Sequence, residues 1–167
     1  TIGGNPVARE QIAECRTAIF DKTGTLTYGE PALTEQLAAP GFTAREVLAL
    51  VASLERYSKH PLARAILAAA KASGLPLGEA SEAREPPGQG ISGKVGGRQV
   101  RITGRPLLAA QPIPGDDQMP PAAGGLECVV AIDGRYAALL RFRDAPRAES
   151  RSFVRHLGPK HHFARVM

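Results

Sequence analysis

The chain has 167 residues, of which 43% are hydrophobic and 22% are charged, proportions that are typical of globular proteins. No apolar run approaches the roughly 18 residues that a membrane-spanning helix requires, since the longest one extends only from Val47 to Leu54. The net charge of +5 comes mostly from arginines scattered along the sequence, whereas nucleic-acid-binding proteins gather such charges on one face. We therefore expect no nucleic acid among its partners. The two cysteines, Cys15 and Cys128, form no CxxC pair, which argues against a disulfide framework and against a zinc site.

The first third of the chain predicts a strand and a helical hairpin. The apolar run 17–20 ends at a polar, glycine-containing sequence, which is typical of a buried strand that meets a loop. Thr43 and Glu46 have the spacing of a capping box, and hydrophobic residues follow at helical intervals. A second helix is expected to begin at Pro61, because a proline in the first helical turn leaves no hydrogen bond unmade. The segment 57–60 would connect the two helices.

The middle of the chain changes from a helical to an alternating pattern, which is typical of β-strands. The dipeptides Gly96-Gly97 and Asp133-Gly134 favour two-residue turns, so each predicts a β-hairpin. The predicted strand pairs are 91–95 with 98–102 and 128–132 with 135–140. The Pro- and Gly-rich segment 111–125 is expected to be a mobile surface loop. A third helix is predicted from Pro146 to about residue 157, and a closing strand over 162–167.

This order of elements predicts an α+β domain, with an antiparallel sheet and a helical hairpin, inserted into an α/β domain. We expect the inserted domain to span 33–141. The flanking parts, 1–32 and 142–167, would then form an incomplete α/β domain.

The most specific motif of the chain is the sequence from Asp21 to Thr27, DKTGTLT. A carboxylate at the end of a buried strand, followed by a glycine loop with hydroxyl groups, suits nucleophilic attack on phosphorus, because loop N–H groups can hold the phosphoryl oxygens. Mg²⁺ would neutralise the charge that builds up between the two anions. We therefore interpret Asp21 as a catalytic nucleophile, and we expect Asp21 and Thr23 to hold Mg²⁺ together with the phosphate. An aspartate that only closes a turn is the alternative.

All seven residues of this motif match the aspartyl-phosphate motif of the P-type ATPases, which the chain resembles from about residue 17 onwards. The resemblance implies that the α/β domain is a partial, haloacid dehalogenase-like phosphorylation domain. Phosphatases of the same superfamily carry a second aspartate where this chain has Thr23, and a threonine cannot act as a general acid. The resemblance therefore implies a persistent phosphoenzyme rather than a simple phosphatase.

The segment 58–66, SKHPLARAI, resembles the SEHPLAxAI segment in the nucleotide-binding domain of heavy-metal P-type ATPases, the copper, zinc and cadmium branch. That family contacts adenine with a glutamate five residues before the histidine, and Glu55 has this spacing from His60. The resemblance thus implies that a Glu55 carboxylate accepts a bond from the adenine amino group while the His60 ring packs beside it. Lys59 departs from the family glutamate. Without the resemblance, His60 would be interpreted as a helix cap.

The sequence 88–93, GQGISG, has the pattern GxGxxG, but the alternating strand that follows it excludes a dinucleotide-binding turn. By itself the pattern predicts a bend before a hairpin. The heavy-metal ATPases have this pattern beside the nucleotide, which implies that Gly88 and Gly90, lacking a Cβ atom, let the backbone approach the ligand. Gly104 also matches a family glycine near the nucleotide. Arg105 departs from the asparagine of some copper pumps and could face the phosphates.

Asp144 and Arg147 belong to a DAPR sequence that resembles the hinge by which the chain returns to the phosphorylation domain; a helix N-terminus capped by Asp144 is compatible with it. Taken together, the resemblance implies the cytoplasmic, ATP-handling part of an integral membrane protein that exports a heavy-metal cation, with copper favoured. Its expected partners are ATP, ADP, the remaining domains of the longer protein, and a metal ion bound elsewhere. We expect the chain to bind nucleotide but not to turn it over. The alternatives are a soluble phosphohydrolase and a non-catalytic nucleotide-binding module.

Overall fold

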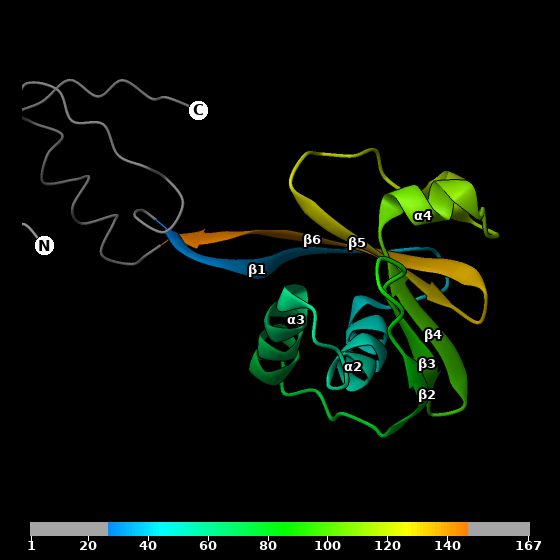
Figure 1. Ribbon diagram of the computed structural model, residues 1–167, viewed down its shortest axis with the longest axis horizontal. Coiled ribbons are helices and arrows are strands. Elements are labelled where there is room, and N and C mark those ends of the chain that lie inside the picture. Colours follow the sequence, from blue (N-terminus) through cyan, green and yellow to red (C-terminus); the bar gives the residue numbers. More distant parts are fainter. Residues whose placement is uncertain (1–26, 147–167) are drawn as a thin grey trace, which may run out of the picture. The chain divides into compact units, whose positions relative to one another are not determined.

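The computed structural model of the protein describes residues 27–146 (Figure 1). One compact unit spans Glu30–Arg143. The strand predicted over 17–20 and the strand predicted over 162–167 lie outside the described residues. Within the described part of the chain, no helix has the length and hydrophobicity needed to cross a bilayer.

A six-stranded sheet forms the framework of this unit, in the order β1-β6-β5-β4-β3-β2. The strands are β1 (Thr27–Ala38), β2 (Ala80–Arg84), β3 (Ile91–Val95), β4 (Arg98–Thr103), β5 (Leu126–Ile132) and β6 (Arg135–Pro146). All pairings from β2 to β6 are antiparallel. Both predicted hairpins are confirmed: Gly96 and Gly97 have φ angles of 57° and 81°, and Asp133 and Gly134 have φ angles of 51° and 74°. Positive φ at both turn positions matches the twist of the paired strands.

Two helices cover one face of the sheet and a shorter helix lies on the other (Figure 1). The helices are α2 (Ala44–Glu55), α3 (Pro61–Ala72) and α4 (Arg105–Ala110), with a 3-10 turn over Asp116–Gln118. Thr43 caps α2, since its Oγ1 accepts a bond of 3.2 Å from the Glu46 N–H. The predicted helical hairpin, with Pro61 opening its second helix, is confirmed. The segment 111–125 contains no strand.

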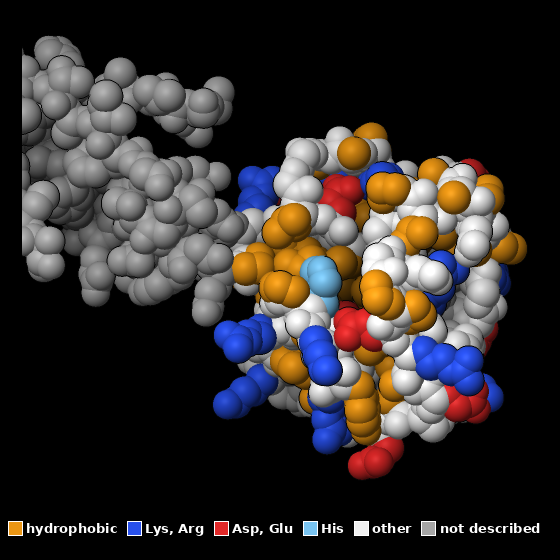
Figure 2. Space-filling view, in the orientation of Figure 1, with side chains coloured by type: hydrophobic (Ala, Val, Ile, Leu, Met, Phe, Trp, Pro, Cys, Tyr) orange, Lys and Arg blue, Asp and Glu red, His pale blue; other side chains and the backbone are white. Residues whose placement is uncertain are grey.

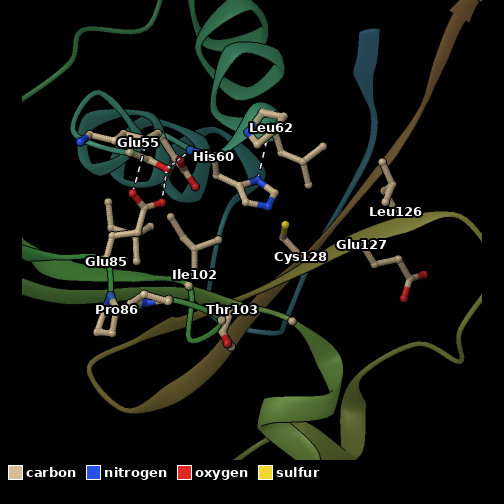
Figure 3. A pocket seen from close by; sticks show the side chains of 18 residues that line it. Glu55, His60, Leu62, Glu85, Pro86, Ile102, Thr103, Leu126, Glu127 and Cys128 are labelled. Atoms are coloured by element: carbon tan, nitrogen blue, oxygen red, sulfur yellow. Dashed lines mark hydrogen bonds between the residues drawn. The ribbon is translucent and has the colours of Figure 1, made fainter. Parts of the chain in front are cut away.

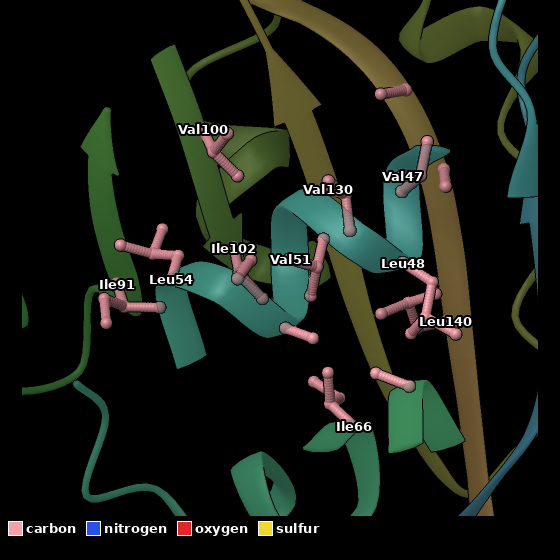
Figure 4. Close-up of a cluster of buried hydrophobic side chains, with 14 of the residues drawn as sticks. Val47, Leu48, Val51, Leu54, Ile66, Ile91, Val100, Ile102, Val130 and Leu140 are labelled. Carbon is pink, nitrogen blue, oxygen red and sulfur yellow. The ribbon is translucent and has the colours of Figure 1, made fainter. Parts of the chain in front are cut away.

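The main core lies between the sheet and the helical hairpin (Figure 4). Val51 and Leu54 of α2 and Ile66 of α3 are completely buried against residues of β3, β4, β5 and β6. Each such side chain contributes roughly 1.5–3 kcal/mol by leaving water. Helices of only 12 residues are marginal in isolation, so this packing is what stabilises α2 and α3. A smaller cluster on the opposite face packs Leu108 of α4 against Val129 and Leu139.

The end of β6 corrects one prediction. β6 continues to Pro146, so Asp144 lies within a strand and no helix begins at Pro146. The pairing of β6 with β5 ends at Phe142, but β1 lies along its other edge and extends the sheet there. A proline is tolerated at a strand end, where no hydrogen bond is demanded of its nitrogen. The rest of the predicted third helix lies outside the described residues.

Candidate functional site

A pocket of about 590 Å³ opens beside the N-terminus of α3 (Figure 3). The α2–α3 connection forms one wall, the β2–β3 connection forms the opposite wall, and the ends of β4 and β5 form the base. All five residues that the sequence predicted to contact a nucleotide line this pocket: Glu55, His60, Gly88, Gly90 and Gly104. The fold thus brings together residues from three separate segments.

Glu55 is the most unusual group in the pocket. It is the last residue of α2 and only 4% exposed, and its Oε2 has no hydrogen-bond partner among the described residues. Burial is the main reason why the pKa of this carboxyl is raised to about 7; a hydrogen bond with Ser58 opposes the rise, and the nearby charge of Glu85 adds to it. A buried polar atom without a partner destabilises the fold and requires an explanation. A ligand N–H that donates to this carboxylate would provide one.

His60 stands at the N-terminus of α3 and serves as its cap. Its Nδ1 accepts a bond of 3.2 Å from the Leu62 N–H. Since Nδ1 is the acceptor, the ring donates through Nε2. His60 is the one histidine in the described part of the chain, and Figure 2 shows the histidine at the surface with hydrophobic side chains around it and an acidic one below. The cap and the pocket wall are therefore two roles of the same side chain.

The two pocket glycines of the GxGxxG pattern, Gly88 and Gly90, differ in whether a side chain would fit at their position. A Cβ atom on Gly90 would lie 2.0 Å from the Ile102 carbonyl oxygen, and its φ is +79°. The missing side chain at Gly90 is thus required by β4, whatever the pocket binds. At Gly88, with φ of +73°, a Cβ atom would have no neighbour within 4 Å. Gly88 therefore leaves one rim of the pocket open.

Arg105 does not present a free cation to the pocket, contrary to the expectation that it could face phosphates. Its Nε and Nη2 donate to Glu127 Oε2 at 3.1 and 2.9 Å, and Nη2 also donates to the Pro120 carbonyl oxygen at 2.9 Å. Glu127 additionally accepts a bond of 2.8 Å from Arg141 Nε. The Glu127 side chain is only 9% exposed, and such a carboxylate needs paired cations. Arg105 supplies one of them.

The pocket residues that were not identified from the sequence include Glu85 and Cys128. The Cys128 sulfur projects into the pocket from β5 (Figure 3). Burial raises the pKa of this thiol to about 12, so it contributes a small apolar surface and not a nucleophile. Glu85 accepts hydrogen bonds from the opposite wall. No sequence motif marks either residue.

Three predicted residues, Asp21, Thr23 and Arg147, lie outside the described residues. Asp144 lies in β6.

The sequence matches the family model described as "Hydrolase: haloacid dehalogenase-like hydrolase" over residues 15–160. The chain belongs to this family. The copper-transporting ATPase 2 of Rhizobium meliloti (strain 1021) is 39% identical to this chain in an alignment of 155 positions that covers 90% of the chain and 19% of that protein. The chain thus spans about a fifth of the length of this curated relative.

Solved structures show the same relationship. The crystal structure of a zinc-transporting PIB-type ATPase matches with a TM-score of 0.75 and 28% identity, over 92% of this chain and 26% of that one. The catalytic domain of the CPx-ATPase CopB-B, described for its conformational changes upon nucleotide binding, matches with a TM-score of 0.60 and 28% identity, over 96% and 56% of the two chains. The predicted resemblance to heavy-metal P-type ATPases, a family of enzymes, is confirmed, as is the predicted fold class.

Proposed function

We propose that residues 33–141 form a domain that binds ATP or ADP in the pocket beside α3. The observation that carries this proposal is the buried carboxylate of Glu55, whose Oε2 lacks a hydrogen-bond partner among the described residues. The adenine amino group is a donor of the kind that this oxygen requires. The pocket also has the size and the largely apolar lining of a small-molecule site, with Ile102 and Leu126 among its walls.

His60 and the glycines complete the proposed adenosine site. The exposed His60 ring offers a flat surface for the adenine base, and its Nε2 is free of the capping bond that Nδ1 makes. The open rim at Gly88 allows the backbone to approach the ligand. Gly104, which also lines the pocket, adds a third position without a side chain.

We further propose that the longer protein is a heavy-metal-exporting P-type ATPase, with copper favoured, and that this chain lies on the cytoplasmic side of the membrane. The parts 1–32 and 142–167 would belong to its phosphorylation domain, where ATP phosphorylates Asp21, and Asp144 and Arg147 would act as a hinge between the domains. Mg²⁺ would neutralise phosphate charge; Asp21 and Thr23, which we expect to hold it, lie outside the described residues. The similarity to a copper-transporting ATPase favours copper as the exported ion, although the structure of a zinc-transporting ATPase is also similar. We expect the chain alone to bind nucleotide without turning it over.

A titration of the chain with ATP, followed through its backbone amide NMR signals, tests the binding site. We expect shifts that cluster at 55–62, 88–90 and 104. Replacing His60 by alanine would also remove the helix cap, so His60→Asn is the sharper variant, because asparagine is a good cap but lacks the imidazole ring. A folded wild-type chain whose spectrum does not change at millimolar ATP would contradict the proposal.

A further inference from the structure

One side chain, Glu85, joins the two opposite walls of the pocket. The Ser58 hydroxyl donates to Glu85 Oε1 at 2.5 Å, and the Lys59 N–H donates to Oε2 at 3.0 Å (Figure 3). Both carboxylate oxygens are therefore used. Within the described part of the chain, these are the only hydrogen bonds between the α2–α3 connection and the segment 85–90.

The hydrogen bonds continue from Glu85 to the imidazole ring. Ser58 Oγ, which donates to Glu85, accepts a bond of 3.0 Å from the His60 N–H. The His60 ring in turn accepts the bond from the Leu62 N–H. A change in the position of the Glu85 carboxylate therefore changes the position of the backbone from which the ring extends.

The hydrophobic core does not hold these two walls at a fixed separation. The core cluster includes Leu54, Leu62 and Ile91, but no residue from 56–61 or from 85–90. The residues 85–89 are all exposed. The width of the pocket at this point thus depends on polar contacts, and a restraint that holds a binding site open in its ligand-ready form raises affinity.

Glu85 has two opposing effects on nucleotide binding, charge repulsion and positioning of the wall, and removal of its charge separates them. Hydrogen bonds from the Lys59 N–H and the Ser58 hydroxyl hold the pKa of this carboxyl below its usual range, so it is ionised at neutral pH. A negative charge at the rim of the pocket repels the phosphates of ATP. If this repulsion were the main effect, removal of the charge would tighten binding; if Glu85 positions the wall, removal would weaken it.

We propose that Glu85 is a positioning residue of the nucleotide pocket, which ties the glycine-bearing wall to the His60-bearing wall. The proposal rests on the proposed function. Its closest analogue in the chain is Glu79, an exposed glutamate that does not line the pocket, and Glu79→Ala therefore serves as the matched control.

The test compares the Kd for ATP of the wild-type chain with those of three variants. Two charge-assisted hydrogen bonds are lost in Glu85→Ala, and we expect its Kd to rise about tenfold. The Kd of Glu85→Gln should lie between those of the wild type and Glu85→Ala. Its amide oxygen still accepts a hydrogen bond from the Lys59 N–H, whereas its NH₂ group cannot accept one from the Ser58 hydroxyl. Glu79→Ala should match the wild type. A Kd for Glu85→Ala that is unchanged or lower would overturn the positioning role.

Hydrogen exchange of the free protein provides a second readout. The Lys59 amide should exchange faster in Glu85→Ala than in the wild type, while amides of α2 and β4 keep their rates, since Glu85 is not part of the core. Unchanged exchange at Lys59 would also overturn the proposal. The two hypotheses fail differently. If the wild-type chain binds no ATP, the proposed function is contradicted. If the wild-type chain binds ATP but the Kd of Glu85→Ala is no higher, only the role of Glu85 is contradicted.

Discussion

Ionisation of Glu55 couples the stability of the domain to pH. Burial raises the pKa of this carboxyl from 4.5 to about 7. An acid whose pKa is raised by folding binds more protons in the folded state than in the unfolded state. Its contribution is therefore most favourable below pH 4.5, and stability decreases as the pH rises towards about 7 and the buried carboxyl ionises.

The size of this effect follows from the difference between the two pKa values. Each pKa unit corresponds to about 1.4 kcal/mol, so the difference between 4.5 and about 7 corresponds to about 3 kcal/mol. Domains of this size have unfolding free energies of about 5–15 kcal/mol. Ionisation of one side chain would thus remove a substantial fraction of the stability.

Urea unfolding of the wild-type chain and of Glu55→Gln, at pH values from about 5 to about 8, measures this contribution. The variant keeps the shape of the side chain but cannot ionise. We expect the smallest advantage for Glu55→Gln at about pH 5, just above the pKa of 4.5 in the unfolded chain, and an advantage that grows to about 3 kcal/mol at about pH 8. Glu79→Gln, at an exposed position, controls for the loss of a surface charge. A difference between wild type and Glu55→Gln that does not vary with pH would refute the reasoning.

Three further predictions follow from the site. Gly90→Ala should lower the melting temperature strongly, because its Cβ would lie 2.0 Å from a carbonyl oxygen of β4. Gly88→Ala should reduce the free energy of unfolding by only about 1–2 kcal/mol, because the alanine must adopt a left-handed backbone conformation but meets no neighbouring atom. Glu127→Ala should reduce the free energy of unfolding by about 2–3 kcal/mol, since it takes the carboxylate partner from the partly buried Arg105 and leaves Arg141 with Glu35 alone; Glu46→Ala, at an exposed ion pair, should change it by less than about 1 kcal/mol. The preference for ATP over GTP, measured as a ratio of Kd values, should be larger at about pH 8 than at about pH 6, because only the protonated Glu55 carboxyl can donate to the guanine oxygen. An equal ratio at both pH values would contradict this last prediction.

Local sequence signals were sufficient for α2, α3 and the two hairpins, whereas α4 was not predicted. The cap at Thr43 and the proline at Pro61 act within one helical turn, and the dipeptide turns act between adjacent residues, so no knowledge of distant contacts was needed. β1 and β2 were not predicted. β1 has no alternating pattern and contains Pro31, and its partner β6 is about a hundred residues away in sequence. β2 is a polar edge strand with almost no buried side chain, so hydrophobic periodicity could not reveal it.

Only those pocket residues that belong to a recognisable sequence motif were predicted. The resemblance to a known family placed Glu55, His60 and the glycines in one pocket, but the burial that raises the Glu55 pKa depends on the packing of α2 against the sheet. Glu85 and Cys128 reach the pocket through the course of β2 and β5, which no local pattern specifies. Arg105 was expected to be able to face phosphates, because its partner, Glu127 of β5, is 22 positions away in the sequence and no local pattern links the two.

The placement of β1 beside β6 has a consequence for the order in which the domain folds. Thr34 and Arg141, which are joined by a hydrogen bond from the Thr34 hydroxyl to the Arg141 carbonyl oxygen, are 107 positions apart. Closing so long a loop requires more conformational entropy than closing the β3–β4 or β5–β6 turn. We therefore expect the local hairpins to form early and β1 to join the sheet last. β1 and β6, the strands through which the chain enters and leaves the domain, would then be the last to pair during folding and the first to separate when the domain unfolds.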